Sequence, residues 1–381
     1  MTTYLDNAAT SFPKPETVYA AMDRCARTSL ANPGRAGHKM AIEAERILDD
    51  GRHRLNQLFH GVAPERFIFT LNGTDALNIA FKGTLNPGDH VITTDLEHNS
   101  VSRPLRAMEL AGTIGLTRLS ADNSGTIDPD AVRRAIAPKT RLIALTHCSN
   151  VLGTVQPIAE IGAMARERDL LFLVDAAQTA GVLPIDIQKM QIDLLAFPGH
   201  KSLMGPTGTG ALYAGPRTNL RAWREGGTGG DSASETQPKE FPYFLEGGTP
   251  NVLGVAGLIA GIQYVEERGL DAIHRHEVEL VERLWRRLDE IDGVTVFGHR
   301  DHGRRVGTIS FQSEALPAAE IGGVLDNSFD IAIRPGLHCA PYIHRALGTF
   351  PDGTVRASPG AFNTTEDIDR LAEALGQILT V

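Results

Sequence analysis

Short apolar runs alternate with longer amphipathic stretches through the first two thirds of the chain. Continuous apolar runs of this length are typical of strands buried on both faces. They lie at residues 67–70, 90–94, 142–146, 170–174, 194–197 and 210–214. Helical patterns such as 36–59 and 158–168 lie between them. This alternation predicts an α/β fold with a mostly parallel sheet and helices on both of its faces.

The last third has a different pattern. Residues 226–248 are rich in Gly, Ser and Pro without a period, which predicts a long loop that is functional or mobile. Helices are then expected at 252–269, 271–291 and 364–379, with a capping box of Thr364 and Asp367, and strands at 294–297, 308–311 and 331–333. We expect a large domain at 15–255 and a smaller α+β domain made of 1–14 and 256–381.

Composition and charge exclude several classes of protein. The chain has 381 residues, of which 42% are apolar, and its formal net charge is −9. Its basic residues are scattered, so we expect neither a nucleic-acid partner nor a membrane surface. No leader segment is recognised and no apolar run is long enough to cross a bilayer, which favours the cytoplasm. Three distant cysteines form neither a disulfide framework nor a zinc motif, so no metal site is expected.

Two polar residues follow neighbouring apolar runs, where parallel strands present their carboxyl ends to ligands. Asp175 is either a helix N-cap or the partner of a cationic ring nitrogen. Lys201, after a Pro-Gly turn and beside His200, is either a solvated charge or a buried amine. Burial and a neighbouring cation would lower the pKa of such an amine and make it nucleophilic toward an aldehyde.

An anion site is expected where the strand at 67–70 runs into Asn-Gly-Thr and a helix. The N–H groups of Gly73 and Thr74 and the Thr74 hydroxyl could bind a phosphate there, although Thr74 or Asp75 could equally be a plain cap. His98 follows the next strand end. It is either a structural histidine or a residue that stacks on a cofactor ring and passes protons.

Several motifs together make the chain resemble the cysteine desulfurases of the class V aminotransferase group, which have the type I fold of pyridoxal-phosphate (PLP) enzymes. The motifs are YLDNAATS, NGTDALN, EHNSV, HCSNVLGTVQPI, VDAAQTAG, GHKSLMGPTGTG, EGGTPN, RPGLHCA and VRAS followed by FNT. They extend nearly from end to end. The resemblance implies a large domain with a seven-stranded type of sheet, PLP as cofactor, L-cysteine as substrate and a homodimer.

The resemblance also assigns a role to each matching residue. Lys201 would carry PLP as a Schiff base and Asp175 would bind the ring nitrogen. The remaining cofactor contacts would come from Gly73, Thr74, His98, Asn150, Gln178, His200 and, across the dimer, Thr249. Arg356 would bind the substrate carboxylate, and the substrate site would also include Asn150, Arg334 and His38. Lys201, His98 and Cys339 would be catalytic.

Cys339 would be the nucleophile that accepts sulfur. The residues around it support this role, because Arg334 and His338 favour the thiolate, and Pro335 and Gly336 suggest a loop. In the implied reaction, L-cysteine displaces Lys201, whose freed amine removes the α-proton. The Cys339 thiolate attacks the substrate sulfur, alanine leaves, and a persulfide remains on Cys339.

Some residues depart from the family pattern and leave alternatives open. The short distance from Arg334 to Cys339 resembles the branch with a short catalytic loop, including selenocysteine lyase-like enzymes, which uses a protein sulfur acceptor. Pro198 stands where relatives often carry a small hydroxyl residue, Leu337 where a second His is common, and the loop 226–248 is short for that branch. A selenocysteine lyase, another carbon–sulfur lyase or a catalytically silent PLP-binding protein are the alternative hypotheses.

Overall fold

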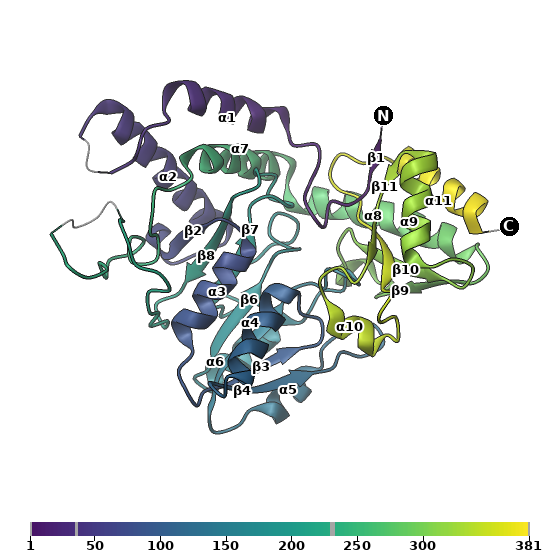
Figure 1. Ribbon diagram of the computed structural model, residues 1–381, viewed down its shortest axis with the longest axis horizontal. Coiled ribbons are helices and arrows are strands. Elements are labelled where there is room, and N and C mark those ends of the chain that lie inside the picture. The colour runs from purple at the N-terminus through teal and green to yellow at the C-terminus, as the bar shows by residue number, and fades with distance from the viewer. Residues whose placement is uncertain (1, 35–36, 229–232, 380–381) are drawn as a thin grey trace.

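The computed structural model describes residues 2–34, 37–228 and 233–379. Its largest element is a seven-stranded sheet of order β2-β8-β7-β6-β5-β3-β4 (Figure 1). Strands β3 to β7 are mutually parallel, and β8 is antiparallel to both of its neighbours. The strands are β2 Phe67–Thr70, β3 His90–Thr94, β4 Gly115–Leu119, β5 Thr140–Thr146, β6 Leu171–Asp175, β7 Leu194–Pro198 and β8 Gly210–Ala214.

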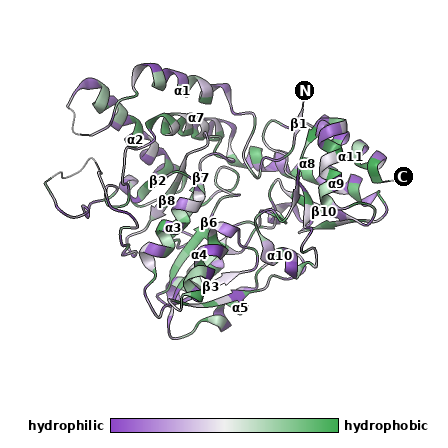
Figure 2. Ribbon diagram, in the orientation of Figure 1, coloured by the Kyte–Doolittle hydropathy of each residue, from purple (hydrophilic) through white to green (hydrophobic). Residues whose placement is uncertain are grey.

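The sheet is buried on both faces, as the continuous apolar runs predict. In β6, Phe172 and Val174 belong to one hydrophobic cluster, whereas Leu171 and Leu173 belong to the other. Successive side chains of a strand point to opposite faces, so a strand that is apolar throughout can fill two cores. Figure 2 shows the hydrophobic residues gathered along the sheet and on the helices that cover it.

Helices cover both faces. Residues of α3 and α4 fill one cluster, and residues of α2, α5 and α6 fill the other. Helices α1 and α7 pack on each other and on α2. The helices are α1 Glu16–Thr28, α2 Lys39–Leu58, α3 Gly73–Thr84, α4 Asn99–Leu110, α5 Pro129–Ala135, α6 Ile158–Glu167 and α7 Val252–Arg268, with a short 3-10 turn at Pro64–Arg66. The predicted α/β fold with a mostly parallel sheet is therefore confirmed.

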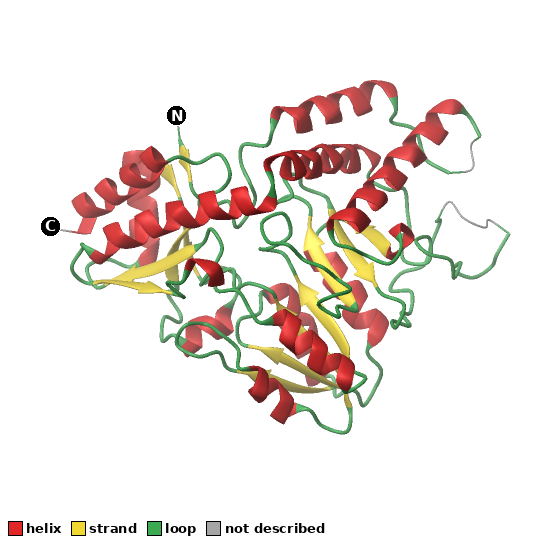
Figure 3. Ribbon diagram, turned by 180° about the vertical axis from the view of Figure 1, so that it is seen from behind, coloured by secondary structure: helices red, strands yellow, loops and turns green. Residues whose placement is uncertain are grey.

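A second unit is formed around a smaller core (Figure 3). A four-stranded sheet of order β12-β13-β10-β9 is antiparallel, and β1 pairs in parallel with β11. Helices α8, α9 and α11 pack around it. The elements are β1 Thr3–Tyr4, α8 Leu270–Asp289, β9 Val294–Phe297, a 3-10 turn His302–Arg304, β10 Ile309–Ser313, α9 Ala318–Phe329, β11 Ile331–Ala332, β12 Arg334–Gly336, α10 Pro341–Ala346, β13 Thr354–Ala357 and α11 Thr365–Leu379.

Three local predictions are corrected by the structure. The strand expected at 331–333 is β11, which ends at Ala332. Pro335 and Gly336 belong to the next strand, β12, instead of a loop, because they pair with Val355 and Thr354 of β13. The helix expected from 36 begins at Lys39, and residue 36 lies outside the described residues. Strand β4 was not predicted. It lies at the edge of the sheet, where none of its residues is buried and polar residues interrupt the apolar run.

The division between the two units involves α7. Residue 256 lies inside this helix, which packs on α1 and α2, whereas α8 packs on α11 and β9. Gly269 separates the two helices and has a φ of 82°, a conformation that favours glycine. We therefore propose that the division lies at Gly269 and that the N-terminal residues through β1 belong to the second unit.

The sequence also predicts a long loop at 226–248 and no segment that crosses a bilayer. Between Ala214 and Val252 the described residues form turns and bends without a helix or strand, as expected for the loop at 226–248, of which 229–232 are outside the description. Among the helices that the structure describes, none is both long and apolar enough to cross a bilayer.

Candidate active site

Ten of the sequence-predicted site residues converge on one cavity of about 190 Å³ at the carboxyl ends of β5, β6 and β7. The first turns of α3 and α4 close it on one side. The predicted residues that line it are Gly73, Thr74, His98, Asn150, Asp175, Gln178, His200, Lys201, Arg334 and Arg356. This is the edge at which α/β sheets bind ligands, because loops there leave a crevice between strands.

Lys201 has a strongly perturbed amine. Burial, helped by Arg356 and Arg334 and opposed by Asp175, lowers the pKa of Lys201 to about 8. The net effect leaves a substantial fraction of neutral amine near neutral pH. A neutral amine is the form that attacks a carbonyl carbon, so this lysine is a competent nucleophile.

We expect the reactivity of Lys201 to rise with pH and to reach half its maximum near pH 8. The charged form of an amine does not attack, so the midpoint follows the folded-state pKa and not the value of about 10.4 for a free lysine. Reductive methylation at a series of pH values, read at Lys201 by mass spectrometry, measures this midpoint. A free lysine derivative in the same tube is the control, and a coincident midpoint would contradict the assignment.

Asp175 is the last residue of β6 and lies buried beside the cavity. Its Oδ1 accepts a hydrogen bond from the Ala177 N–H at 2.9 Å. Burial raises the pKa of this carboxyl, and Ala177 and Lys201 oppose the rise. A buried carboxylate needs a cationic partner, and a protonated ring nitrogen in the cavity would supply one.

Helix α3, where the anion site is expected, is capped by neither Thr74 nor Asp75. Asn72 is the N-cap, and its side chain accepts from the Asp75 N–H at 2.9 Å. The Thr74 hydroxyl is therefore not the cap, and it bonds the Ser100 hydroxyl at 2.8 Å. Gly73 lies against Pro198, where an added Cβ would be 3.3 Å from Cδ. Gly73 and Thr74 at the start of α3 line the cavity, which is where a helix N-terminus can bind an anion.

His98 has a structural role and also faces the cavity. Its side chain caps α4 by accepting from the Ser100 N–H at 3.1 Å. Burial lowers the pKa of His98 to about 4, and Lys201 and Arg334 contribute to the lowering. The ring is therefore neutral at neutral pH. A neutral ring in this position can stack on an aromatic cofactor without adding a charge to the site.

Arg356 is buried by contacts that sequence reasoning did not foresee. It donates to the Asn150 carbonyl at 3.0 Å and to Asp6 Oδ1 at 2.6 Å. Asp6 was missed because it lies 350 residues away from Arg356, and its only signal was the YLDNAATS motif. Gln178 donates to the Ala8 carbonyl at 3.1 Å, so the same N-terminal segment forms one wall of the cavity.

The N-terminal segment also holds the turn that carries Lys201. Ser11 donates from its backbone to the His200 carbonyl and from its hydroxyl to the Lys201 carbonyl at 2.8 Å. Lys14 donates to the His200 carbonyl at 2.7 Å. The acceptors of these bonds are backbone carbonyls of the turn. The bonds therefore fix the position of Lys201 and do not use its amine.

Cys339 lies on a tight loop next to the cavity. Arg334 donates to its Sγ at 3.2 Å, and the thiol is partly exposed. His338 and Cys339 have φ values of 47° and 59°, an unusual left-handed pair for residues with side chains. By contrast, Cys25 and Cys148 are buried, and burial raises the pKa of each of their thiols.

Two hydrogen bonds, one to a residue of the cavity wall and one to the start of α4, hold this strained loop. The Asn150 side chain donates to the His338 carbonyl at 2.7 Å, and the Asn99 N–H donates to the Cys339 carbonyl at 2.7 Å. Asn99 directly follows His98 at the start of α4. The loop is therefore tied to Asn150 of the cavity wall and to the start of α4, which keeps the Cys339 sulfur beside the cavity.

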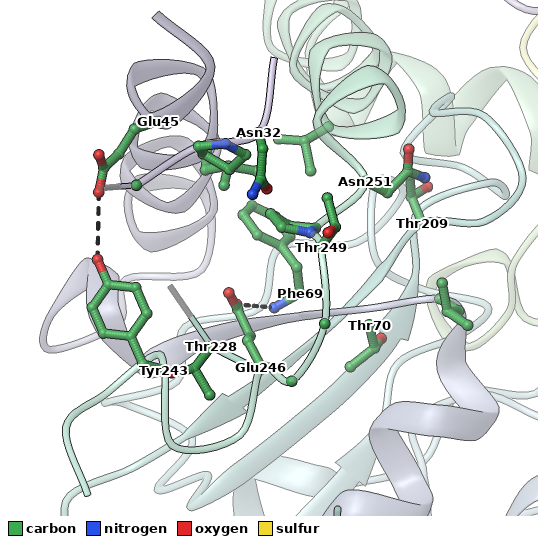
Figure 4. A pocket seen from close by; sticks show the side chains of 18 of the residues that line it. Asn32, Glu45, Phe69, Thr70, Thr209, Thr228, Tyr243, Glu246, Thr249 and Asn251 are labelled. Atoms are coloured by element: carbon green, nitrogen blue, oxygen red, sulfur yellow. Dashed lines mark hydrogen bonds between the residues drawn. The ribbon is translucent and has the colours of Figure 1, made fainter. Parts of the chain in front are cut away.

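Thr249 and His38 lie outside this cavity. Thr249 lines a second cavity of about 360 Å³ (Figure 4). There Glu246 accepts from the Phe69 N–H at 2.7 Å and pairs with Arg52 at 2.6 Å. His38 caps α2 through Nδ1, which accepts from the Ala41 N–H, and lines neither cavity. Within one chain, neither residue joins the Lys201 site.

Fold and site together define a member of the class V aminotransferases, and the chain belongs to this family. The family model, described as aminotransferase class V, matches residues 3–371. Enzymes of this family depend on PLP.

Similar proteins and solved structures are named cysteine desulfurases, the family that the sequence motifs resemble. A probable cysteine desulfurase of Halalkalibacterium halodurans is 37% identical, covering 98% of this chain and 92% of its own length. A cysteine desulfurase of Yersinia pestis is 36% identical, covering 98% of this chain and 93% of its own. The apo structure of a cysteine desulfurase from Thermococcus onnurineus has a TM-score of 0.94 at 32% identity, covering 100% of this chain and 95% of the other. The predicted membership is confirmed.

Proposed function

We propose that the chain is a PLP-dependent cysteine desulfurase that converts L-cysteine to L-alanine and keeps the sulfur as a persulfide on Cys339. The observation that carries the proposal is the thiol of Cys339, held by Arg334 on a strained loop beside the Lys201 cavity. A transaminase has no use for such a thiol. Relatives named as cysteine desulfurases support the same reaction.

The donor set of the cavity fits PLP. The amine of Lys201 would bind its aldehyde, Asp175 its ring nitrogen, and His98 would stack on the ring. Its phosphate would lie at the first turn of α3, near Thr74 and His200, with Asn150 and Gln178 toward the ring oxygen. When bound, PLP supplies an electron sink for the electrons released at the α-carbon of the substrate.

Substrate binding, proton removal and the attack on sulfur would be carried out by side chains of the protein. Arg356 would bind the substrate carboxylate with its planar guanidinium, which Asp6 and the Asn150 carbonyl hold in position. The amine of Lys201 would remove the α-proton. Cys339 thiolate would attack the substrate sulfur, so that a sulfur–sulfur bond forms as the carbon–sulfur bond breaks, and Arg334 would stabilise that thiolate.

The location of Thr249 supports a homodimer. Its predicted role is to contact the phosphate of a neighbouring subunit, and it lies outside the Lys201 cavity of its own chain. A second copy would have to bring Thr249 to that phosphate. The short segment from Arg334 to Cys339 is also consistent with the branch that passes its persulfide to an acceptor protein.

One experiment tests the proposed function directly. Purified protein is loaded with PLP and given L-cysteine, and alanine, sulfide and the mass of Cys339 are measured in a single turnover. We expect one alanine per site and a gain of one sulfur on Cys339. Absence of alanine from protein that has taken up PLP would refute the proposal.

Replacement of Arg356 by lysine should raise the KM for L-cysteine by about 10- to 100-fold, because an ammonium cannot form the two-pronged bond to a carboxylate. Steady-state alanine formation measures the effect. Arg283→Lys is the matched control, since Arg283 also pairs with a carboxylate but lies on the exposed side of α8. An equal change of KM in both variants would contradict a specific role for Arg356.

A further inference from the structure

An unpaired group of arginines lies around the segment that follows Cys339. Arg118 of β4 lies over the ring of Tyr342 at 3.7 Å, and Arg345 lies over Phe350 at 4.8 Å. Tyr342 and Arg345 belong to α10, which begins two residues after Cys339. Arg103 is exposed on α4. Arg345 is exposed as well, whereas the Nε and Nη2 atoms of Arg118 are buried. We call Arg103 and Arg345 the arginine rim.

The rim adjoins the reactive thiol. The N–H of Asn99, the first residue of α4, donates to the Cys339 carbonyl. Arg103 is four residues further along that helix, a rise of about 6 Å. Figure 1 shows α4 and α10 on the same side of the molecule, and the contact of Arg118 with Tyr342 joins α10 to the edge strand β4.

The charges of the rim are not neutralised. Neither Arg103 nor Arg345 forms an ion pair with another residue that the structure describes, whereas Arg118 lies near the Asp95 carboxyl and opposes the rise in its pKa that burial causes. The neighbouring Arg106 does have a partner, Glu109 at 2.6 Å. This local positive charge is unusual on a chain of net charge −9. The substrate does not require it, because L-cysteine carries no net charge at neutral pH.

We propose that the arginine rim is the docking surface for the sulfur acceptor, and that the accepting thiol is carried on an acidic protein segment. This inference rests on the proposed function. Opposite charge would steer the segment to the thiol and hold it while sulfur moves. An extended polyanion such as RNA fits less well, since the rim is small and the rest of the chain repels it.

The transfer step needs no further reactant. The acceptor thiolate attacks the outer sulfur of the Cys339 persulfide, forming a new sulfur–sulfur bond. The bond between that sulfur and Cys339 breaks, and Cys339 leaves as a thiolate that takes up the proton lost by the acceptor. The acceptor thus becomes a persulfide and Cys339 regains its starting state.

Two peptides that differ only in charge test the proposal. Each has one cysteine, flanked by aspartates in one peptide and by lysines in the other. After one turnover of L-cysteine, we expect transfer to the acidic peptide to be at least about tenfold faster at low salt, and the difference to shrink as salt screens it. The double variant R103E/R345E should remove this preference while the amount of alanine stays unchanged.

The controls separate this inference from the proposed function. The double variant R268E/R275E makes the same charge change at the junction of α7 and α8 and should keep the preference. Binding of an acidic peptide with serine in place of cysteine, followed by fluorescence anisotropy, needs no catalysis and tests the rim even if no alanine forms. Equal binding of acidic and basic peptides, or tighter binding of mixed RNA, would overturn the proposal.

Discussion

Lys201→Ala should abolish alanine formation from L-cysteine, with a loss of at least about 10³-fold in kcat. The variant loses the only amine that lies between Asp175 and the first turn of α3 in the described cavity. Protein loaded with PLP should also lose the visible absorption band of a Schiff base. Borohydride reduction followed by mass spectrometry should find PLP attached to Lys201 in the wild type and to no residue in the variant.

Lys14 provides a demanding control for this experiment. Burial lowers its pKa to about 8 as well, and it lies close enough to donate to the His200 carbonyl. It does not line the cavity beside Asp175. Lys14→Met should therefore keep the PLP label on Lys201. PLP found on Lys14, or a visible Schiff-base band that remains in Lys201→Ala, would contradict the assignment of Lys201. Either result would show that a lowered pKa is enough to select the lysine that binds PLP.

Cys339→Ala should reduce sulfur removal from L-cysteine by at least about 10³-fold, because no other described thiol can reach the substrate sulfur. PLP should still bind, since Cys339 does not line the cavity. Alanine formation from L-selenocysteine should be affected less, because selenide leaves more easily than sulfide. Alanine and sulfide or selenide are measured for both substrates.

Cys148→Ala is the matched control, as its thiol is buried beneath the second unit. It should keep full sulfur transfer, with at most a loss of stability from the missing thiol volume. Iodoacetamide should label Cys339 first in the folded protein. After L-cysteine the label should sit on the outer persulfide sulfur, so that dithiothreitol removes it, whereas a label on the free thiol resists the reductant. Full activity of Cys339→Ala with L-cysteine would refute the proposed chemistry.

Much of the site was predictable because its residues follow buried strands. Asp175 ends β6, and Lys201 follows β7 by three residues. An apolar run identifies the strand, and parallel strands bring their carboxyl ends to one edge, so two residues far apart in sequence are expected together. The edge strand β4 was not found by this signal, because none of its residues is buried and no continuous apolar run marks it.

The Cys339 loop shows where local reasoning failed. Pro335 and Gly336 suggested a loop, but pairing with β13 makes them a strand. The pairing depends on a partner nearly twenty residues away, and local propensity for a turn does not report it. The positive charge near the thiol was anticipated correctly for Arg334. Burial lowers the pKa of His338 to about 2, however, so this histidine is neutral.

By itself the sequence determined the parallel sheet, the edge of the sheet where the cavity lies and most of the residues that line it, because apolar runs and the residues after them are local features. Only the tertiary structure decided how these groups are held. The Asp6–Arg356 pair and the bonds of Asn99 and Asn150 to the Cys339 loop join segments far apart in the chain. Such contacts depend on how two units pack together, and no local pattern in the sequence encodes them.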